Sequence, residues 1–209
     1  MARHRKAAGA YHHGDLRRAL LQEAIRCVER HGLAALSLRD LALRLGVSPS
    51  APYHHFADRG ALLRELAAQG FAGLEAAMDG ELADVGPSPS DRLGALGRAY
   101  VRFAIANPGQ FQVMFHPEVA ALQEASTAKE GRAFKLLEQC VVGCQAAAGR
   151  ADRDPMPGVV AMWGAAHGIA KLFLEGPLGK MLSRQELERI AANANKILRR
   201  ALVLPAEDD

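Results

Sequence analysis

The sequence predicts an all-α protein. Across its 209 residues, apolar side chains recur at the three- and four-residue spacing of amphipathic helices, and no segment alternates as a half-buried strand does. Hydrophobic residues make up 49% of the chain, enough for a sizeable core. The clearest break in composition is VGPSPS at 85–90. We therefore expect a small N-terminal helical domain, 14–74, and a larger C-terminal helical domain, 85–205.

Charge is distributed unevenly between these two parts. Residues 1–66 contain 11 Lys and Arg against 6 Asp and Glu, with six of the eight His, whereas the remainder contains 15 against 17. A basic N-terminal part suits a polyanionic partner such as nucleic acid. The segment 1–13 is a basic tail, and its Arg3, Arg5 and Lys6 are candidates for phosphate contacts. A tail without fixed structure is the alternative.

The first predicted helix is Asp15 to His31. Its apolar residues recur on one face, and several arginines lie mostly outside that face. The inner face consists of Leu16, Leu20, Leu21, Ala24, Ile25 and Val28.

The segment Ser37 to Phe56 predicts two short helices joined by a tight turn. Ser37 is a good N-cap for the first, and Gly46 ends it because glycine adopts positive φ at low cost. Ser48 is the N-cap expected for the second helix, with Pro49 at its first position. The apolar stripe of the first helix consists of Leu38, Leu41, Ala42 and Leu45.

The second of these helices, about Ser48 to His55, is expected to be held by Tyr53 and Phe56. Small and polar residues then remain on its outer side, as in the helix that enters the major groove in helix-turn-helix proteins. An ordinary helical hairpin is the alternative. Pro52 lies inside this helix, where it removes one backbone hydrogen-bond donor. The candidate DNA contacts are Lys6, Arg39, Ser48, Pro49, Ser50, Ala51, Tyr53, His54 and His55.

The run GLAALSLRDLALRLGVSPSAPYHHFADRGALLREL closely resembles the DNA-binding domain of TetR-family transcriptional regulators. The resemblance covers about the first third of the chain and rests on Gly32, the helix-turn-helix, and the Tyr53-x-x-Phe56 pattern. It implies a three-helix DNA-binding domain and a fourth helix, here Ala61 to about Leu82, that leads to the larger domain.

The rest of the chain predicts helices separated by Asn-Pro, His-Pro and Gly-Pro breaks. We expect them at Asp91 to Ala106, Pro108 to Phe115, Glu118 to about Ala148, Gly158 to Leu174, and Arg184 to Leu202.

Aromatic and methionine side chains concentrate in two stretches of this larger domain. Facing helices with such residues form either a filled core or a cavity for an apolar ligand. The Trp163-x-x-x-His167-Gly168 pattern, with the earlier Asn-Pro-x-x-Phe-x-x-Met-Phe run from Asn107, resembles the WHG-type ligand-binding domain of a TetR subfamily. The candidate effector pocket consists of Tyr100, Phe103, Phe111, Met114, Phe115, Met162, Trp163 and His167.

The last two long helices are the expected dimer surface, which the resemblance implies. A dimer also suits a palindromic operator, because a single short recognition helix makes few base contacts. The apolar stripe of the final helix consists of Leu187, Ile190, Ala191, Ala194, Ile197, Leu198 and Leu202.

The sequence contains no convincing pattern for catalysis, metal binding or cofactor binding. Cys140 and Cys144 lie four residues apart, which is two ligands short of a structural zinc site. No apolar run reaches the roughly 18 residues of a membrane span, and the basic start has no secretory hydrophobic region. Three cysteines suit a reducing compartment. We expect a cytoplasmic protein.

These observations favour a DNA-binding transcriptional regulator, most simply a ligand-responsive repressor that acts as a dimer. Its expected partners are a palindromic double-stranded operator, a largely apolar small molecule and a second copy of the chain. An activator or a ligand-independent regulator is the nearest alternative. A small helical enzyme that binds a small molecule is the alternative from another class.

Overall fold

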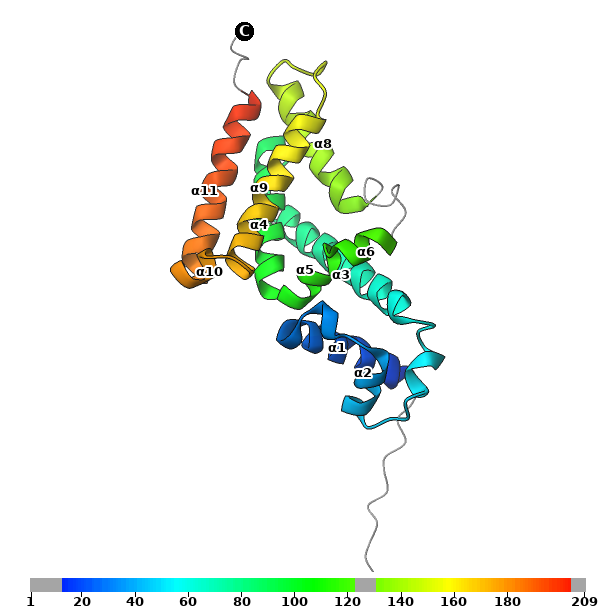
Figure 1. Ribbon diagram of the computed structural model, residues 1–209. Coiled ribbons are helices and arrows are strands. Elements are labelled where there is room, and N and C mark those ends of the chain that lie inside the picture. Colours follow the sequence, from blue (N-terminus) through cyan, green and yellow to red (C-terminus); the bar gives the residue numbers. More distant parts are fainter. Residues whose placement is uncertain (1–12, 123–130, 204–209) are drawn as a thin grey trace, which may run out of the picture. The chain divides into compact units, whose positions relative to one another are not determined.

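A computed structural model describes residues 13–122 and 131–203, and all its regular elements there are helices, as predicted (Figure 1). The chain divides after Leu66, within the third long helix, into two compact units. The functional domain limits 14–74 and 85–205 stay a prediction. The elements in chain order are α1 (His13–His31), η1 (Leu33–Ala35), α2 (Leu38–Leu45), η2 (Ala51–His54), α3 (Arg59–Ala83), α4 (Pro89–Ala106), α5 (Pro108–Met114), α6 (Pro117–Leu122), α8 (Arg132–Ala147), α9 (Met156–Leu174), α10 (Leu178–Met181) and α11 (Arg184–Val203).

The N-terminal unit, which ends at Leu66, is built on α1. This helix packs against η1, α2 and η2. Each fully buried leucine stabilises the unit by about 1.5–3 kcal/mol relative to an exposed one. The largest of its fully buried side chains are Leu20, Val28, Leu41, Leu62, Leu63 and Leu66.

The ends of α2 are formed as the sequence predicts. The Ser37 hydroxyl accepts a hydrogen bond from the Asp40 N–H at 3.1 Å. Gly46 has φ 68° and ψ 28°, and its N–H points back to the carbonyls of Ala42 and Leu43. A side chain with a Cβ would be strained there, so glycine fixes the turn that follows α2.

The second helix of the predicted pair differs from expectation. It is a short 3₁₀ helix, η2, that begins at Ala51, so the prediction of an N-cap at Ser48 and helix from Pro49 is wrong. The Tyr53 N–H donates to the Ser50 carbonyl and the His55 N–H donates to the Pro52 carbonyl, both three residues back. Pro52 has no N–H to continue an α-helical ladder, which explains the tighter coil.

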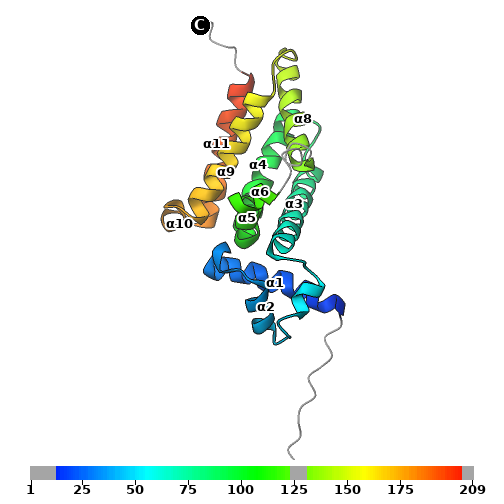
Figure 2. The ribbon, with the colours of Figure 1, turned by 45° about the vertical axis from the view of Figure 1, so that its right-hand side comes forward.

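The C-terminal unit is a helical bundle with α4 at its centre. This helix packs against α5, α8, α9 and α11. Figures 1 and 2 show α9 and α11 side by side and antiparallel, with α10 between their ends. Close packing of α11 on α4 requires Gly97, because a Cβ there would overlap the Asn195 side-chain amide.

One predicted helix of this unit is interrupted. Instead of one helix from Glu118 to about Ala148, α6 ends at Leu122 and α8 begins after Gly131, whose φ −58° and ψ 136° are not helical. Glycine in a helix interior is about 1 kcal/mol less favourable than alanine, which favours a helix break at Gly131.

The helix α9 is more apolar than the sequence analysis allowed. Within the described residues it is the one helix whose length and composition would let it cross a membrane, with a mean hydropathy of 1.2. The statement that no run reaches that length is therefore wrong for Met156–Leu174. One such helix is weak evidence of a membrane span. Only 22% of the window is buried within the chain, so α9 also presents an apolar surface.

Candidate functional site

The turn between α2 and η2 presents small polar residues to solvent. Ser48, Pro49 and Ser50 are all exposed. The hydroxyls of Ser48 and Ser50 lie 3.2 Å apart and share a hydrogen bond. Such short side chains let another molecule approach the backbone closely, and both hydroxyls keep further hydrogen-bonding capacity.

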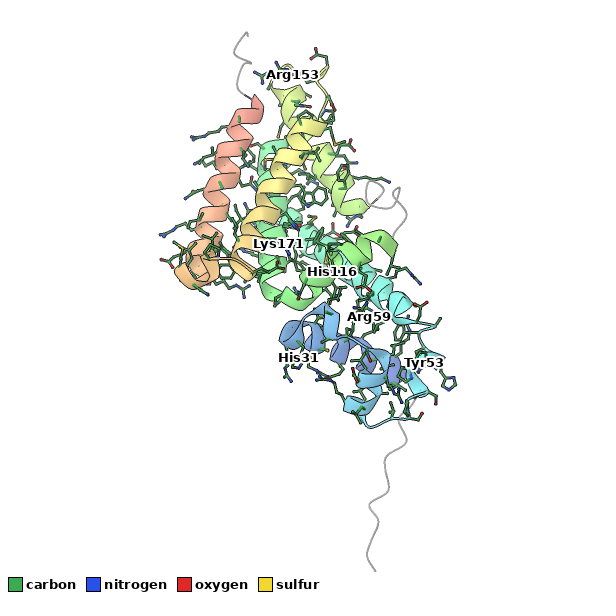
Figure 3. All side chains as sticks on the ribbon, in the orientation of Figure 1. His31, Tyr53, Arg59, His116, Arg153 and Lys171 are labelled. Carbon is green, nitrogen blue, oxygen red and sulfur yellow. The ribbon has the colours of Figure 1, made fainter. Side chains whose placement is uncertain are left out.

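Two side chains anchor η2, and one of them, Phe56, is among the two that the sequence suggested. Pro52 and Phe56 are buried, whereas Tyr53 is 54% exposed and lies at the surface (Figure 3). The expectation that Tyr53 holds this helix down is therefore wrong. A tyrosine held outward presents a flat ring and a hydroxyl to a partner.

The remaining predicted contacts of this region face outward to different degrees. His54 is exposed, while Ala51 and His55 are half-buried. Arg39 on α2 is exposed. Lys6 lies outside the described residues. The structure thus brings together, on one surface segment, Ser48, Pro49, Ser50, Tyr53 and His54, which we call the reader surface.

Two arginines of the N-terminal unit, Arg17 of α1 and Arg59 of α3, make contacts within the unit. Arg17 forms an ion pair with Glu65 at 3.2 Å, and its guanidinium lies 5.5 Å from the centre of the Phe56 ring. Arg59, which sequence reasoning missed, donates to the carbonyls of Leu33 and Leu36, both at 2.8 Å. These contacts brace the segments on either side of the reader surface.

Four of the aromatic residues singled out in the C-terminal unit, Tyr100, Phe111, Phe115 and Trp163, form a cluster with His167. The His167 ring centre lies 4.7 Å from that of Phe115 and 5.3 Å from that of Phe111. Trp163 lies 6.4 Å from Phe115, and 6.3 Å from Phe134, a member that sequence reasoning missed.

Hydrogen bonds connect the side chains of Trp163, Tyr100 and His167 in series. The Trp163 indole N–H donates to the Tyr100 hydroxyl at 3.4 Å, and that hydroxyl lies 2.8 Å from His167 Nδ1. While it accepts from the indole, the Tyr100 hydroxyl can donate to Nδ1, and in that arrangement the neutral His167 ring carries its proton on Nε2. Burial, with a smaller effect of Lys171, lowers the pKa of His167, and burial raises the pKa of Tyr100. The cluster is therefore neutral.

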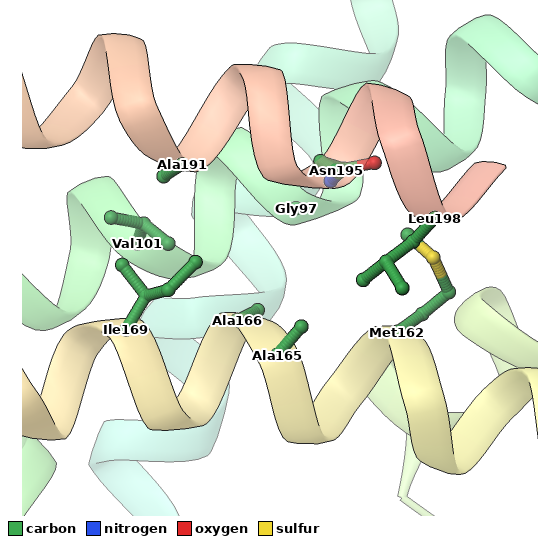
Figure 4. A pocket seen from close by; sticks show the side chains of 9 residues that line it. All are labelled: Gly97, Val101, Met162, Ala165, Ala166, Ile169, Ala191, Asn195 and Leu198. Carbon is green, nitrogen blue, oxygen red and sulfur yellow. The ribbon is translucent and has the colours of Figure 1, made fainter. Parts of the chain in front are cut away.

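The other predicted pocket residues belong to the same hydrophobic core but take no part in the Trp163–Tyr100–His167 hydrogen bonds. Phe103 and Met114 are buried against Gly73 and Gly70 of α3. Met162 lines a cavity between α4, α9 and α11, shown in Figure 4, whose volume is about 10 Å³. That volume holds at most one water molecule. Trp163, 38% exposed, gives the cluster an edge at the surface.

The lowered pKa of His167 predicts how stability depends on pH. An unfolded histidine protonates near pH 6.5, whereas the folded one resists protonation, so stability is present above this pH and lost below it. The melting temperature should fall more between about pH 7.5 and about pH 5.5 for the wild type than for His167→Gln. Equal falls, measured by circular dichroism, would remove His167 from this role.

Other candidate chemistry was sought in the described residues. They contain no group of three or more His, Cys, Asp and Glu side chains that could hold a metal ion. Cys140 and Cys144 are buried free thiols, and burial raises the pKa of both. They are core residues with little thiolate character.

Comparison with protein families gives two matches along the chain. Residues 20–66 match the family described as bacterial regulatory proteins, tetR family, and residues 93–194 match the description tetracyclin repressor-like, C-terminal domain. Together the two matches span both compact units.

Individual proteins are also similar. An HTH-type transcriptional regulator of Mycobacterium tuberculosis is 35% identical over 86 residues, which are 41% of this chain and 37% of that protein. The chain thus matches little more than a third of that relative. A solved protein of unknown function from Rhodococcus sp. RHA1 is 33% identical, with a TM-score of 0.73 and coverage of 94% of this chain and 100% of that chain. AibR, solved with isovaleryl coenzyme A and operator DNA, has a TM-score of 0.66 at 19% identity, covering 85% and 96%. At that identity the likeness to AibR concerns the fold alone.

Proposed function

The chain belongs to the TetR family of bacterial transcriptional regulators, and from this membership we propose that it is a dimeric repressor released from its operator by a small apolar ligand. It is a DNA-binding regulator and not an enzyme. The observation that carries the proposal is the reader surface, where small and polar side chains face outward while Pro52 and Phe56 hold the segment from beneath. Such a regulator works where the DNA is, in the cytoplasm.

The reader surface is proposed to enter the major groove. Ser48, Ser50 and Ala51 permit close approach, and their neighbours His54 and Tyr53 reach base edges or phosphates. Arg39 contributes a positive charge for the DNA backbone, which makes affinity dependent on salt.

Replacing Tyr53 by alanine should weaken operator binding by about 1–3 kcal/mol while leaving the melting temperature unchanged, because the side chain is mostly exposed. Tyr53→Phe separates the hydroxyl from the ring. Binding is measured by gel shift and stability by thermal unfolding. Unchanged binding in Tyr53→Ala would remove this residue from the contact surface.

Dimerisation is proposed through the outer faces of α9 and α11. Leu172, Ile190 and Ile197 are exposed there, and a Cβ added at Gly164 or Gly168 would meet nothing within 4 Å. Flat glycine positions beside exposed apolar side chains let a second helix pair approach closely, and large apolar patches mark interfaces. The stripe predicted on the last helix is divided, because Leu187 and Ala191 are buried in the chain's own core.

The effector site is proposed at the aromatic cluster. Its lining is apolar and aromatic, with the neutral Tyr100–His167 pair as the polar group that orients a ligand. AibR, which shares the fold, carries both a ligand and operator DNA, which supports one molecule serving both partners. Because the rings are closely packed, a ligand must displace some of them, starting at the exposed edge of Trp163.

A ligand acts as an inducer only if it prefers the conformation that does not fit the operator. Moving the population from almost all DNA-competent to almost all incompetent requires a preference of about 5.5 kcal/mol. An activator or a ligand-independent regulator would use the same reader surface. A reporter gene placed under the control of the operator distinguishes these two from a ligand-responsive repressor.

Trp163 is the single tryptophan of the chain, so its fluorescence reports directly on the proposed effector site. Apolar ligands that release the protein from DNA should change the intensity or wavelength of this emission. His167→Ala should weaken the response. A ligand that releases DNA without any change in Trp163 emission would place the effector elsewhere.

A further inference from the structure

A hollow of about 230 Å³ lies on the surface of the C-terminal unit between α4 and α11. It is separate from the aromatic cluster and shares none of its residues. It also lies across α11 from the exposed Ile190 and Ile197 of the proposed dimer surface, since Glu188 and Ala192 occupy the other side of that helix. Its lining consists of Arg98, Val101, Arg102, Glu188, Arg189, Ala191 and Ala192.

Three arginines line this hollow. Arg98 and Arg102 are one turn apart on α4, and Arg189 comes from α11. The uncharged residues of the lining, Val101, Ala191 and Ala192, have short side chains. Arginine presents planar donor pairs that match the oxygens of phosphate groups.

Three carboxylates lie near these arginines. Glu81 accepts from Arg98 Nε at 3.1 Å and also binds Arg102. Glu188 accepts from Arg102 Nε at 3.0 Å and from Arg184 Nε at 3.2 Å. Hydrogen bonds from Ser183, its main partner, lower the pKa of Glu186, and the charge of Arg189 contributes to this lowering. Four arginines therefore face three glutamates, which leaves an excess of one positive charge.

Donor capacity remains on the arginines that line the hollow. Within the described residues, Arg189 makes no hydrogen bond or ion pair, and Arg98 uses only Nε. The pairing of Arg102 with Glu188 and Glu81 raises the pKa of its guanidinium and fixes its position. A hollow with excess positive charge and unused, partly fixed donors is suited to an anion.

We propose that this hollow binds a small, multiply charged anion of the phosphate type, held between Arg98, Arg102 and Arg189. Its volume is below the roughly 300 Å³ at which pockets for organic ligands begin, so the expected ligand is the size of phosphate or pyrophosphate. This site is independent of the proposed effector site and of DNA binding.

The test is isothermal titration of the full-length protein with inorganic pyrophosphate, alongside its effect on the melting temperature. Arg189→Ala should weaken binding by about tenfold or more, because one charge-assisted contact is lost. The variant should fold normally, since Arg189 makes no hydrogen bond or close ion pair within the described residues and only a longer-range electrostatic contact with Glu186. The matched control is Arg153→Ala, which removes the same charge from the loop between α8 and α9 (Figure 3).

Binding by the wild type and by Arg153→Ala, with a clear loss in Arg189→Ala, supports the site. Equal binding by the two variants overturns it, as does absence of heat and of thermal stabilisation with the wild type. Gel shifts on the same samples keep this result separate from the proposed function, because operator binding should be the same in Arg189→Ala and the wild type.

Discussion

Replacing Phe56 by alanine is expected to lower the free energy of unfolding of the N-terminal unit by about 3–5 kcal/mol. The ring is 3% exposed and is covered on one side by the Arg17 guanidinium. Its removal leaves a cavity beneath η2 and also removes the surface on which Arg17 lies. Because most small domains are stable by only about 5–15 kcal/mol, operator binding should be lost near physiological temperature.

Chemical denaturation followed by circular dichroism measures this effect, and Phe56→Leu is the matched control. Leucine keeps much of the buried volume, so its cost should stay below about 1.5 kcal/mol. If Phe56→Ala were as stable as Phe56→Leu, the ring would not support η2 as the structure indicates.

The second large effect is expected when charge is placed on the proposed dimer surface. Ile190 is 40% exposed and Ile197 is 67% exposed, two turns apart on α11. The double variant Ile190→Glu with Ile197→Glu would bury unpaired carboxylates at the interface, which is strongly unfavourable. The protein should become monomeric and lose at least about a hundredfold in affinity for a palindromic operator, because two linked half-site contacts become one.

Analytical ultracentrifugation measures the assembly state, and gel shifts measure operator affinity. Val142→Glu is the control, because Val142 is a 43% exposed apolar residue on α8, a helix that is not part of the proposed dimer surface. A double variant that stays dimeric would show that the copies meet through another surface.

Local signals in the sequence were sufficient for both ends of α2. Ser37 and Gly46 cap α2 as predicted, because a hydroxyl acceptor and a positive φ are needs that adjacent residues satisfy. The backbone conformation near Pro52 was harder to predict from the sequence. The missing donor was evident, but whether the chain would bend or tighten depends on the burial of Pro52 and Phe56, which is a tertiary property.

Periodicity also misplaced Tyr53. Its spacing from Phe56 suggests one shared face in a helix, yet η2 ends at His54, so Phe56 lies beyond the helix and the two side chains share no helical face. Phe56 is inside and Tyr53 is outside. A helical period cannot anticipate a helix that ends between the two residues.

The C-terminal site was predicted by residue type and only partly by position. Tyr100 and His167 meet although 67 residues separate them, because α4 and α9 pack against each other. Phe103 and Met114 carry the same apolar signal but fill the space beside glycines of α3. Composition marks which residues are buried, and only helix packing decides which of them become neighbours.

The central claim is that the reader surface recognises DNA sequence through the major groove. Selection of genomic fragments by the purified protein, followed by sequencing, tests it most directly when the wild type and Tyr53→Ala are run in parallel. The wild type should enrich one palindromic sequence with half-sites related by the twofold axis of a dimer, and Tyr53→Ala should lose that enrichment while remaining folded. Failure of the wild type to enrich any shared sequence, or identical enrichment by both proteins, would contradict the account.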